Sequence, residues 1–293
     1  MKLSEIKSGV HVEREGEFSS IAEMSRWRNG ALLPVTDLIQ VEKLTKGKFS
    51  GCVITTRDLA SKTPAGLGVL TSENPTESLY EIHNDLVRRS GFYQHIPANE
   101  IDESAVIHPT AVIAEKGVRI SSGCVVGPKA TIMENTTLGK GVVIGPGSVI
   151  GDEDTLIIRR GSSSEKVLSA GGVLVGEKVE IHSNCSISRA IFGGRTVIAA
   201  GTMIDNLVRI GQNAKIGERC FIVACASIGA NVDMGEEIWI GPNSTISDGV
   251  TLGDRAYVTL GAVVVDDVGP DKKVSGNYAI DHEKFIEFLK KIR

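Results

Sequence analysis

The chain has 293 residues, of which 33 are glycine, and only 4% are aromatic. With 41% hydrophobic and 23% charged residues, its composition excludes both a disordered chain and a membrane protein. The formal net charge of −4 and the lack of a basic cluster argue against nucleic acid as a partner. Residues 1–22 mix charges and lack the apolar stretch of a secretory signal, so we expect a cytoplasmic protein.

Residues 1–98 carry no repeat and predict a small α/β domain. The apolar runs 51–55 and 66–70 are typical of short strands. Asn74 and Pro75 predict the start of a helix, because Asn is a common capping residue and Pro fits the first turn. The inward face of that helix is expected to contain Leu79, Ile82, Leu86 and Val87.

Residues 99–268 contain an aliphatic residue at every sixth position, with two interruptions. The first two runs are Ile101, Ile107, Ile113, Ile120, Val126, Ile132, Leu138, Ile144 and Ile150, and then Val175, Ile181 and Ile187. The third run is Ile198, Ile204, Ile210, Ile216, Ile222, Ile228, Met234, Ile240, Ile246, Leu252, Val258 and Val264. Such a period fits a parallel β-helix in which each hexapeptide forms one side of a triangular coil.

We therefore predict a mainly β fold, with a solenoid of about eight coils in which residues eighteen apart stack about 4.8 Å from each other. Known hexapeptide solenoids are left-handed, and we expect the same hand here. Cys124, Cys185 and Cys220 each lie two positions before an aliphatic repeat residue, so they should be small buried fillers rather than reactive thiols.

Two interruptions should leave the solenoid, residues 152–172 as a loop and residues 188–197 as a shorter bulge. Arg159, Arg160 and Lys166 in the loop could bind a phosphate or carboxylate, or could form a solvated basic loop. Residues 269–293 form a tail, in which Asp281 can cap a helix with a basic side that packs on the solenoid or on a neighbouring subunit.

Several segments carry a resemblance to a known family. They are IHPTAVI from Ile107, VGEKVEI from Val175 and IDNLVRIGQNAKIG from Ile204, within an interrupted solenoid that follows an α/β domain. The chain resembles the UDP-3-O-acylglucosamine N-acyltransferases of lipid A synthesis. The resemblance implies a homotrimer that moves an acyl group from a thioester of coenzyme A or acyl carrier protein to the amino group of a nucleotide-linked amino sugar. It implies no permanently bound cofactor, and the basic C-terminal helix could receive the carrier protein.

The chain departs from the family at its catalytic positions. Gln212 stands where the family has its catalytic histidine, and Gln cannot accept a proton at neutral pH. Ala230 matches the family's oxyanion glycine, whose backbone N–H the change of side chain need not remove. Residues 34–40, PVTDLIQ, lack the aromatic residues with which the family stacks uracil. Candidate substrate-binding residues are Asn206, Asn213, Arg159 and Arg160.

Stacking also predicts two features on the outer surface. His182 and Asp205 should lie one coil apart on one side of the solenoid, where the carboxylate could orient the imidazole as an alternative base. Outward residues eighteen apart should form an apolar stripe, which we interpret as a trimer interface or as a wall of the acyl groove: Met203, Phe221, Trp239 and Tyr257.

Three functions remain open from the sequence. The first is an N-acyltransferase that acts by positioning its substrates or through the His182 and Asp205 pair. The second is a catalytically silent homologue that binds sugar nucleotides or scaffolds an assembly. The third, a metal hydrolase, needs three histidine ligands, whereas the solenoid contains only His108 and His182.

Overall fold

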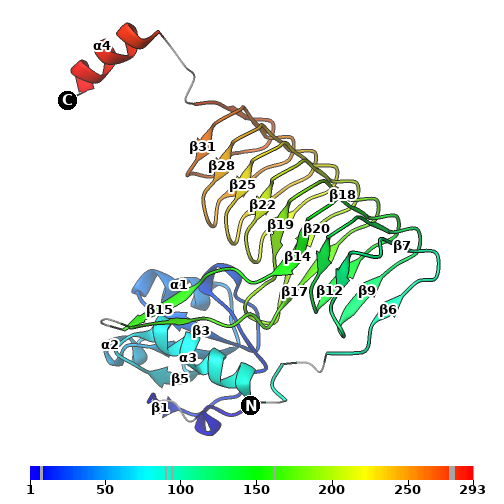
Figure 1. Ribbon diagram of the computed structural model, residues 1–293. Coiled ribbons are helices and arrows are strands. Elements are labelled where there is room, and N and C mark those ends of the chain that lie inside the picture. The colour runs from blue at the N-terminus through cyan, green and yellow to red at the C-terminus, as the bar shows by residue number, and fades with distance from the viewer. Residues whose placement is uncertain (7–8, 90, 94–95, 161–162, 277–280, 293) are drawn as a thin grey trace.

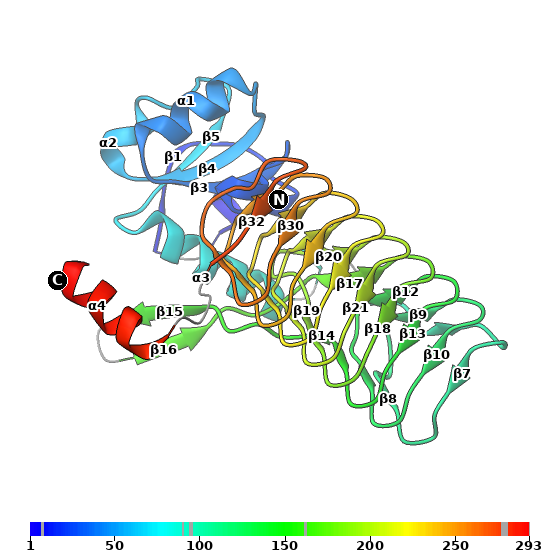
Figure 2. The same cartoon turned by 90° about the horizontal axis from the view of Figure 1, so that it is seen from above.

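The computed structural model describes residues 1–6, 9–89, 91–93, 96–160, 163–276 and 281–292. It confirms a mainly β fold, with a left-handed parallel β-helix, an α/β domain beside it and a C-terminal helix (Figure 1). The view from above shows the coils stacked one behind another (Figure 2). No helix in these ranges is both long and apolar enough to cross a membrane.

The N-terminal domain contains a five-stranded sheet of order β1-β5-β4-β3-β2, in which only β1 is antiparallel to its neighbour. Its strands are β1 (His11–Arg14), β2 (Ser20–Ile21), β3 (Ala31–Val35), β4 (Gly51–Thr55) and β5 (Gly68–Thr71). Its helices are η1 (Leu3–Glu5), η2 (Met24–Arg26), α1 (Leu38–Lys46), α2 (Arg57–Ala60) and α3 (Pro75–Arg88).

The predicted elements of this domain are confirmed at β4, β5 and α3, although the Asn74 side chain makes no capping hydrogen bond. Strand β3, which lies between β4 and β2, was not predicted because it contains Pro34, which cannot donate to a sheet. The structure tolerates it because β2 pairs only with Ala31 and Leu32, and so ends before Pro34. The segment 34–40 forms the end of β3 and the start of α1, where Asp37 Oδ1 accepts the Gln40 N–H at 2.8 Å.

The solenoid has three faces. Face 1 contains β6 (Glu100–Ile101), β9 (Val118–Ile120), β12 (Thr136–Leu138), β17 (Gly172–Val175), β20 (Arg195–Ile198), β23 (Lys215–Ile216), β26 (Asp233–Met234) and β29 (Thr251–Leu252). Face 2 contains β7 (Val106–Ile107), β10 (Val125–Val126), β13 (Val143–Ile144), β18 (Glu180–Ile181), β21 (Met203–Ile204), β24 (Phe221–Ile222), β27 (Trp239–Ile240), β30 (Tyr257–Val258) and β32 (Lys273–Val274). Face 3 contains β8 (Val112–Ile113), β11 (Thr131–Ile132), β14 (Val149–Asp152), β19 (Ser186–Ser188), β22 (Arg209–Ile210), β25 (Ser227–Ile228), β28 (Thr245–Ile246) and β31 (Val263–Val264).

The interior of the solenoid follows the six-residue repeat. Aliphatic repeat residues stack in register from coil to coil, as Ile181 does on Ile204 and Ile204 on Ile222. Cys124, Cys185 and Cys220 are buried among them, as predicted. The coils continue past residue 268, because β32 pairs with β30 inside the segment that the sequence assigned to the tail.

The interruption expected at residues 152–172 leaves the coils over residues 153–171, but the expected loop contains an ordered hairpin of β15 (Ile157–Arg160) and β16 (Ser163–Lys166). Ile158 and Val167 of this segment are buried in the core of the N-terminal domain. Ile191 and Phe192 of the second bulge enter the same core. Both interruptions therefore fasten the N-terminal domain to the solenoid.

The C-terminal helix α4 (His282–Ile292) stands clear of the coils of its own chain (Figure 1). Asp281 caps it as predicted, since its carboxylate accepts the Glu283 N–H at 3.1 Å. Phe285 and Phe288 of this helix are exposed. The expected packing of this helix on its own solenoid is thus not observed.

His83 joins helix α3 to the end of the inserted hairpin. Its Nε2 lies 2.6 Å from the carbonyl oxygen of Leu168, and its Nδ1 contacts the Tyr93 hydroxyl. A carbonyl oxygen only accepts, so Nε2 carries the proton and Nδ1 accepts from Tyr93. Burial lowers the pKa of His83 to about 4, so the ring is neutral at pH 7.

We expect this histidine to make the domain junction sensitive to acid. The pKa of His83 is lower in the folded than in the unfolded chain. Its contribution to the stability of the fold is therefore complete above about pH 6.5 and is lost as the pH falls towards 4. The loss should reach about 3 kcal/mol of the free energy of unfolding. Urea unfolding from pH 7 to pH 4.5 should show a shallower pH dependence for His83→Gln than for the wild type. Equal slopes would contradict this assignment.

Candidate functional site

The predicted catalytic residues lie at two different corners of the solenoid. His182 and Asp205 follow strands of face 2, at the corner with face 3. Gln212 and Ala230 follow strands of face 3, at the corner with face 1. One face of about six residues separates the corners by roughly 15–20 Å. A single chain therefore does not bring the two groups together.

Gln212 is buried, with an exposed fraction of 6%. Its backbone N–H donates to Asp154 Oδ2 at 3.2 Å, and its carbonyl oxygen accepts the Asn231 N–H at 2.8 Å. The side-chain Oε1 is buried and has no hydrogen-bond donor among the described residues. A buried acceptor without a donor is energetically unfavourable. A hydrogen bond from an N–H group of a ligand would therefore stabilise this oxygen.

Asp154 is a part of the site that the sequence did not reveal. It comes from the first interruption, and its two oxygens accept from Arg209 Nη2 at 2.8 and 2.9 Å. Burial raises the pKa of its carboxyl, but N–H donation from Thr155 and Gln212 and the charge of Arg209 outweigh burial and lower it. Asp154 is therefore an anion at neutral pH and fixes the backbone of Gln212. The acidic run at residues 152–154 was the available signal.

The backbone N–H of Ala230 donates to Asp248 Oδ1 at 2.7 Å. The donor that the sequence assigned to an oxyanion is thus taken by a carboxylate in this structure. Asn213 lies beside Gln212 in the left-handed backbone region, with φ of 57°. Its side chain donates to Asn231 Oδ1 at 3.2 Å, so the corner asparagines also stabilise the turns.

The N-terminal domain covers this corner through two residues that the sequence did not indicate. Arg26 forms an ion pair with Asp233 and donates to the carbonyl oxygens of Asn231 and Asn213, at 2.8 and 3.2 Å. Glu23 accepts from the Tyr80 hydroxyl at 3.2 Å and from Asn231 Nδ2 at 3.1 Å. Burial raises the pKa of Glu23. Arg26 and Asp233, like Glu23 and Asn231, lie about 200 residues apart in the chain, which no local pattern reveals.

His182 and Asp205 are neighbours, as stacking predicted. His182 Nδ1 lies 3.7 Å from Asp205 Oδ1, and His182 Nε2 lies 3.7 Å from Glu180 Oε2. The histidine side chain is 44% exposed. Asp205 also accepts the Asn206 N–H at 2.7 Å, and Asn206 Oδ1 accepts the Ser183 N–H at 3.0 Å. Asn206 therefore holds the turns that carry this pair.

The predicted stripe on face 2 is present. Adjacent strands pair Met203 with Phe221, Phe221 with Trp239, and Trp239 with Tyr257. The Trp239 and Tyr257 rings stack at 5.7 Å with an interplanar angle of 4°. Lys273 Nζ lies 4.9 Å from the centre of the Tyr257 ring. The stripe is a partly exposed apolar surface along four coils.

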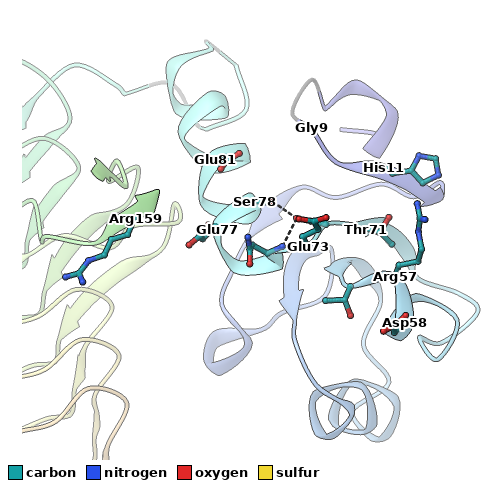
Figure 3. Close-up of a pocket in the computed structure, with 13 residues that line it drawn as sticks. Gly9, His11, Arg57, Asp58, Thr71, Glu73, Glu77, Ser78, Glu81 and Arg159 are labelled. Atoms are coloured by element: carbon teal, nitrogen blue, oxygen red, sulfur yellow. Dashed lines mark hydrogen bonds between the residues drawn. The ribbon is translucent and has the colours of Figure 1, made fainter. Parts of the chain in front are cut away.

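Arg159 lines a cavity of about 960 Å³ at the carboxyl ends of β4 and β5, a common position for ligands of α/β sheets (Figure 3). Figure 3 shows Arg159 of β15 on one side of α3, and Thr71 and Arg57 on the other. Four acidic residues line the cavity, Asp58, Glu73, Glu77 and Glu81, against Arg57, Arg159 and His11. The side chain of Arg160 lies outside the described part of the chain.

The residues that could form a metal centre are dispersed. Within the described ranges, no three His, Cys, Asp or Glu side chains come together as a possible metal site. The arrangement expected of the third candidate function, a metal hydrolase, is therefore not found in these ranges.

Comparisons with known proteins agree with the fold. The model of the bacterial transferase hexapeptide family (six repeats) matches residues 117–152. The UDP-3-O-acylglucosamine N-acyltransferase of Helicobacter pylori strain J99 is 31% identical over 250 residues, which cover 76% of this chain and 73% of the relative. The same enzyme of Campylobacter curvus is 31% identical over 247 residues, which cover 76% of each chain.

Among solved structures, the UDP-N-acetylglucosamine acyltransferase from Campylobacter jejuni aligns with a TM-score of 0.44 and 17% identity, over 66% of this chain and 83% of that one. The two curated relatives match most of the chain at 31% identity. The chain therefore belongs to the UDP-3-O-acylglucosamine N-acyltransferase family and is an acyltransferase.

Proposed function

We propose that the chain transfers an acyl group from a thioester of coenzyme A or acyl carrier protein to the amino group of a nucleotide-linked amino sugar, in lipid A or surface polysaccharide synthesis. The names of the relatives support this substrate class. The observation that carries the proposal is the buried Gln212 Oε1, which has no donor in the described part of the chain and stands at the position of the family histidine.

Gln212 would act by orienting the amine of the substrate. A neutral amine can donate one N–H to Oε1 and direct its lone pair at the thioester carbon. The new C–N bond forms, the C–S bond breaks, and the proton that nitrogen loses goes to the departing thiolate or to water. Asp154 keeps the Gln212 backbone in place. An oxyanion that used the Ala230 N–H would have to displace Asp248.

The His182 and Asp205 pair is an alternative proton acceptor. The pair lies at the other corner of its own chain, so a neighbouring subunit would have to bring it to Gln212. A homotrimer that packs through the stripe of Met203, Phe221, Trp239 and Tyr257 would provide such neighbours. Asn206, Asn213 and Arg159 remain candidate contacts of the substrate, and the basic side of α4 a candidate site for the carrier protein.

The trimer can be tested at the stripe. Trp239→Glu places a charge in the middle of this apolar surface and should reduce a trimer to monomers. Val112→Glu, at an exposed position of face 3, is the matched control and should leave the trimer intact. Light scattering after size-exclusion chromatography gives the masses. If Trp239→Glu keeps the mass of the wild type, the stripe is not the subunit interface.

A silent homologue that only binds sugar nucleotides is the second candidate. It is favoured by the Asp248 carboxylate on the Ala230 N–H and by the Gln in place of histidine. Release of free thiol from acyl-CoA or acylated carrier protein, measured against UDP- and dTDP-linked amino sugars, separates the two. Release that depends on the amino sugar supports the transferase. Saturable binding of the nucleotide sugar without release in any combination supports the silent homologue.

A further inference from the structure

A second cavity, of about 400 Å³, lies between the N-terminal domain and the corner that carries Gln212. We propose that it binds the nucleoside diphosphate part of a nucleotide sugar, a proposal that rests on the function proposed above. The lining residues that carry the argument are Arg28, Arg195, Phe92, Tyr93, Gly171 and Gly194.

The charge of this cavity suits a diphosphate. Arg28 and Arg195 are the charged side chains among the described residues that line it. Arg28 Nε donates to Ser20 Oγ at 3.2 Å, and Arg195 Nη1 donates to Thr137 Oγ1 at 3.0 Å. These acceptors are neutral, and within the described ranges neither arginine forms an ion pair with a carboxylate. Two guanidinium groups without counter-charge favour an anion, and guanidinium geometry suits phosphate oxygens.

The same cavity offers aromatic surface for a planar base. Phe92 and Tyr93 are half-buried and pack edge to face, with ring centres 5.0 Å apart. The Tyr93 hydroxyl is held by His83, which fixes the ring in place. Nucleic bases stack well on such rings, and a volume of this size lies within the range of small-molecule sites. A ligand that combines an anion with a planar ring fits this set of groups.

The floor of the cavity connects it to the proposed catalytic corner. A Cβ added at Gly194 would meet nothing closer than 4.0 Å, and one of its two nearest atoms is Asn213 Oδ1. Packing therefore does not require a glycine at this position, and its absent side chain leaves room next to the residue that follows Gln212. A nucleotide in the cavity would place its sugar towards that corner.

The larger cavity beside Arg159 suits a diphosphate less well. Its four carboxylates, from Asp58, Glu73, Glu77 and Glu81, oppose two arginines and a histidine. The negative charge of these carboxylates should lower the affinity for an anion several-fold at least. The nucleotide should therefore choose the smaller cavity, although Arg159 was the candidate that the sequence provided.

Calorimetric titration of the full chain with UDP, dTDP and pyrophosphate tests this inference. Arg28→Gln and Arg195→Gln should each weaken UDP or dTDP binding at least about tenfold, because each removes a charged hydrogen-bond donor. Arg57→Gln, which removes an arginine from the larger cavity, is the matched control and should bind like the wild type. Gly194→Val should weaken binding without a change of charge. Unchanged melting temperatures establish that the variants are folded.

Three outcomes would overturn the inference: wild-type binding by both Arg28→Gln and Arg195→Gln, an equal loss in Arg57→Gln, or pyrophosphate that binds as tightly as UDP and dTDP. The experiments distinguish a failure of this nucleotide site from a failure of the proposed acyl-transfer function. If thiol release requires a nucleotide sugar but its KM is unchanged in both arginine variants, this site is wrong and the function stands. If the arginines control UDP binding but no donor and acceptor react, the function is wrong and the site stands.

Discussion

Arg26→Ala is expected to lower the free energy of unfolding by about 3 kcal/mol. The substitution removes the ion pair with Asp233 and the hydrogen bonds to the carbonyl oxygens of Asn231 and Asn213. The side chain of Arg26 is mostly buried, so water replaces these partners poorly. The N-terminal domain should loosen from the corner that carries Gln212. Chemical denaturation, with hydrogen exchange of residues 20–35, measures both effects.

Arg219→Ala is the matched control for this prediction. Arg219 also contacts carboxylates, those of Glu218, Glu236 and Glu237, but it lies on the exposed corner between faces 1 and 2. Exposed ion pairs contribute little, so the control should change stability far less than Arg26→Ala does. Equal losses for Arg26→Ala and Arg219→Ala would mean that Arg26 does not hold the two domains together.

Substitutions of Gln212 should have the largest effects on activity. Gln212→Ala removes the acceptor that we assign to the substrate amine, and kcat should fall about tenfold or more. Gln212→His restores the residue type of the family. It should raise kcat, because a positioned general base is worth about 10²-fold or more, and should add an acidic limb to the pH profile.

His182→Ala distinguishes orientation of the amine by Gln212 from proton transfer to His182. If orientation by Gln212 suffices, this variant keeps the wild-type rate across the pH range. A loss of about 10²-fold, with loss of an acidic limb, would instead assign the proton to His182 and its neighbour Asp205. Glu180→Gln is the control, since it also contacts His182 but carries no role in the mechanism.

The repeat in the sequence was sufficient to predict the solenoid, because the same residue type must fill the same interior position on every coil. It predicted the pairing of Met203 with Phe221 and the contact of His182 with Asp205 for the same reason. It could not predict the hairpin of β15 and β16 or strand β3. The form of the hairpin depends on the packing of Ile158 in the core of the N-terminal domain. Strand β3 can contain Pro34 because β2 pairs only with Ala31 and Leu32.

The candidate site was only partly visible in the sequence. The repeat places Gln212 and Asp205 at corners, and the structure separates these two corners by a whole face. Arg26, Glu23 and Asp154 approach the Gln212 corner from segments with no repeat, so no periodicity signals them. The charge of the cavities also depends on such long-range contacts.

The most direct test of the proposed function is the chemical identity of the product. Wild-type protein, an acyl thioester donor and a UDP- or dTDP-linked amino sugar are incubated, and the sugar nucleotide is analysed by mass spectrometry before and after hydroxylamine treatment. We predict a mass increase of one acyl group that resists hydroxylamine, as an amide does. No mass increase with any pair, or an acyl group that hydroxylamine removes as it does from an ester, would contradict N-acyl transfer.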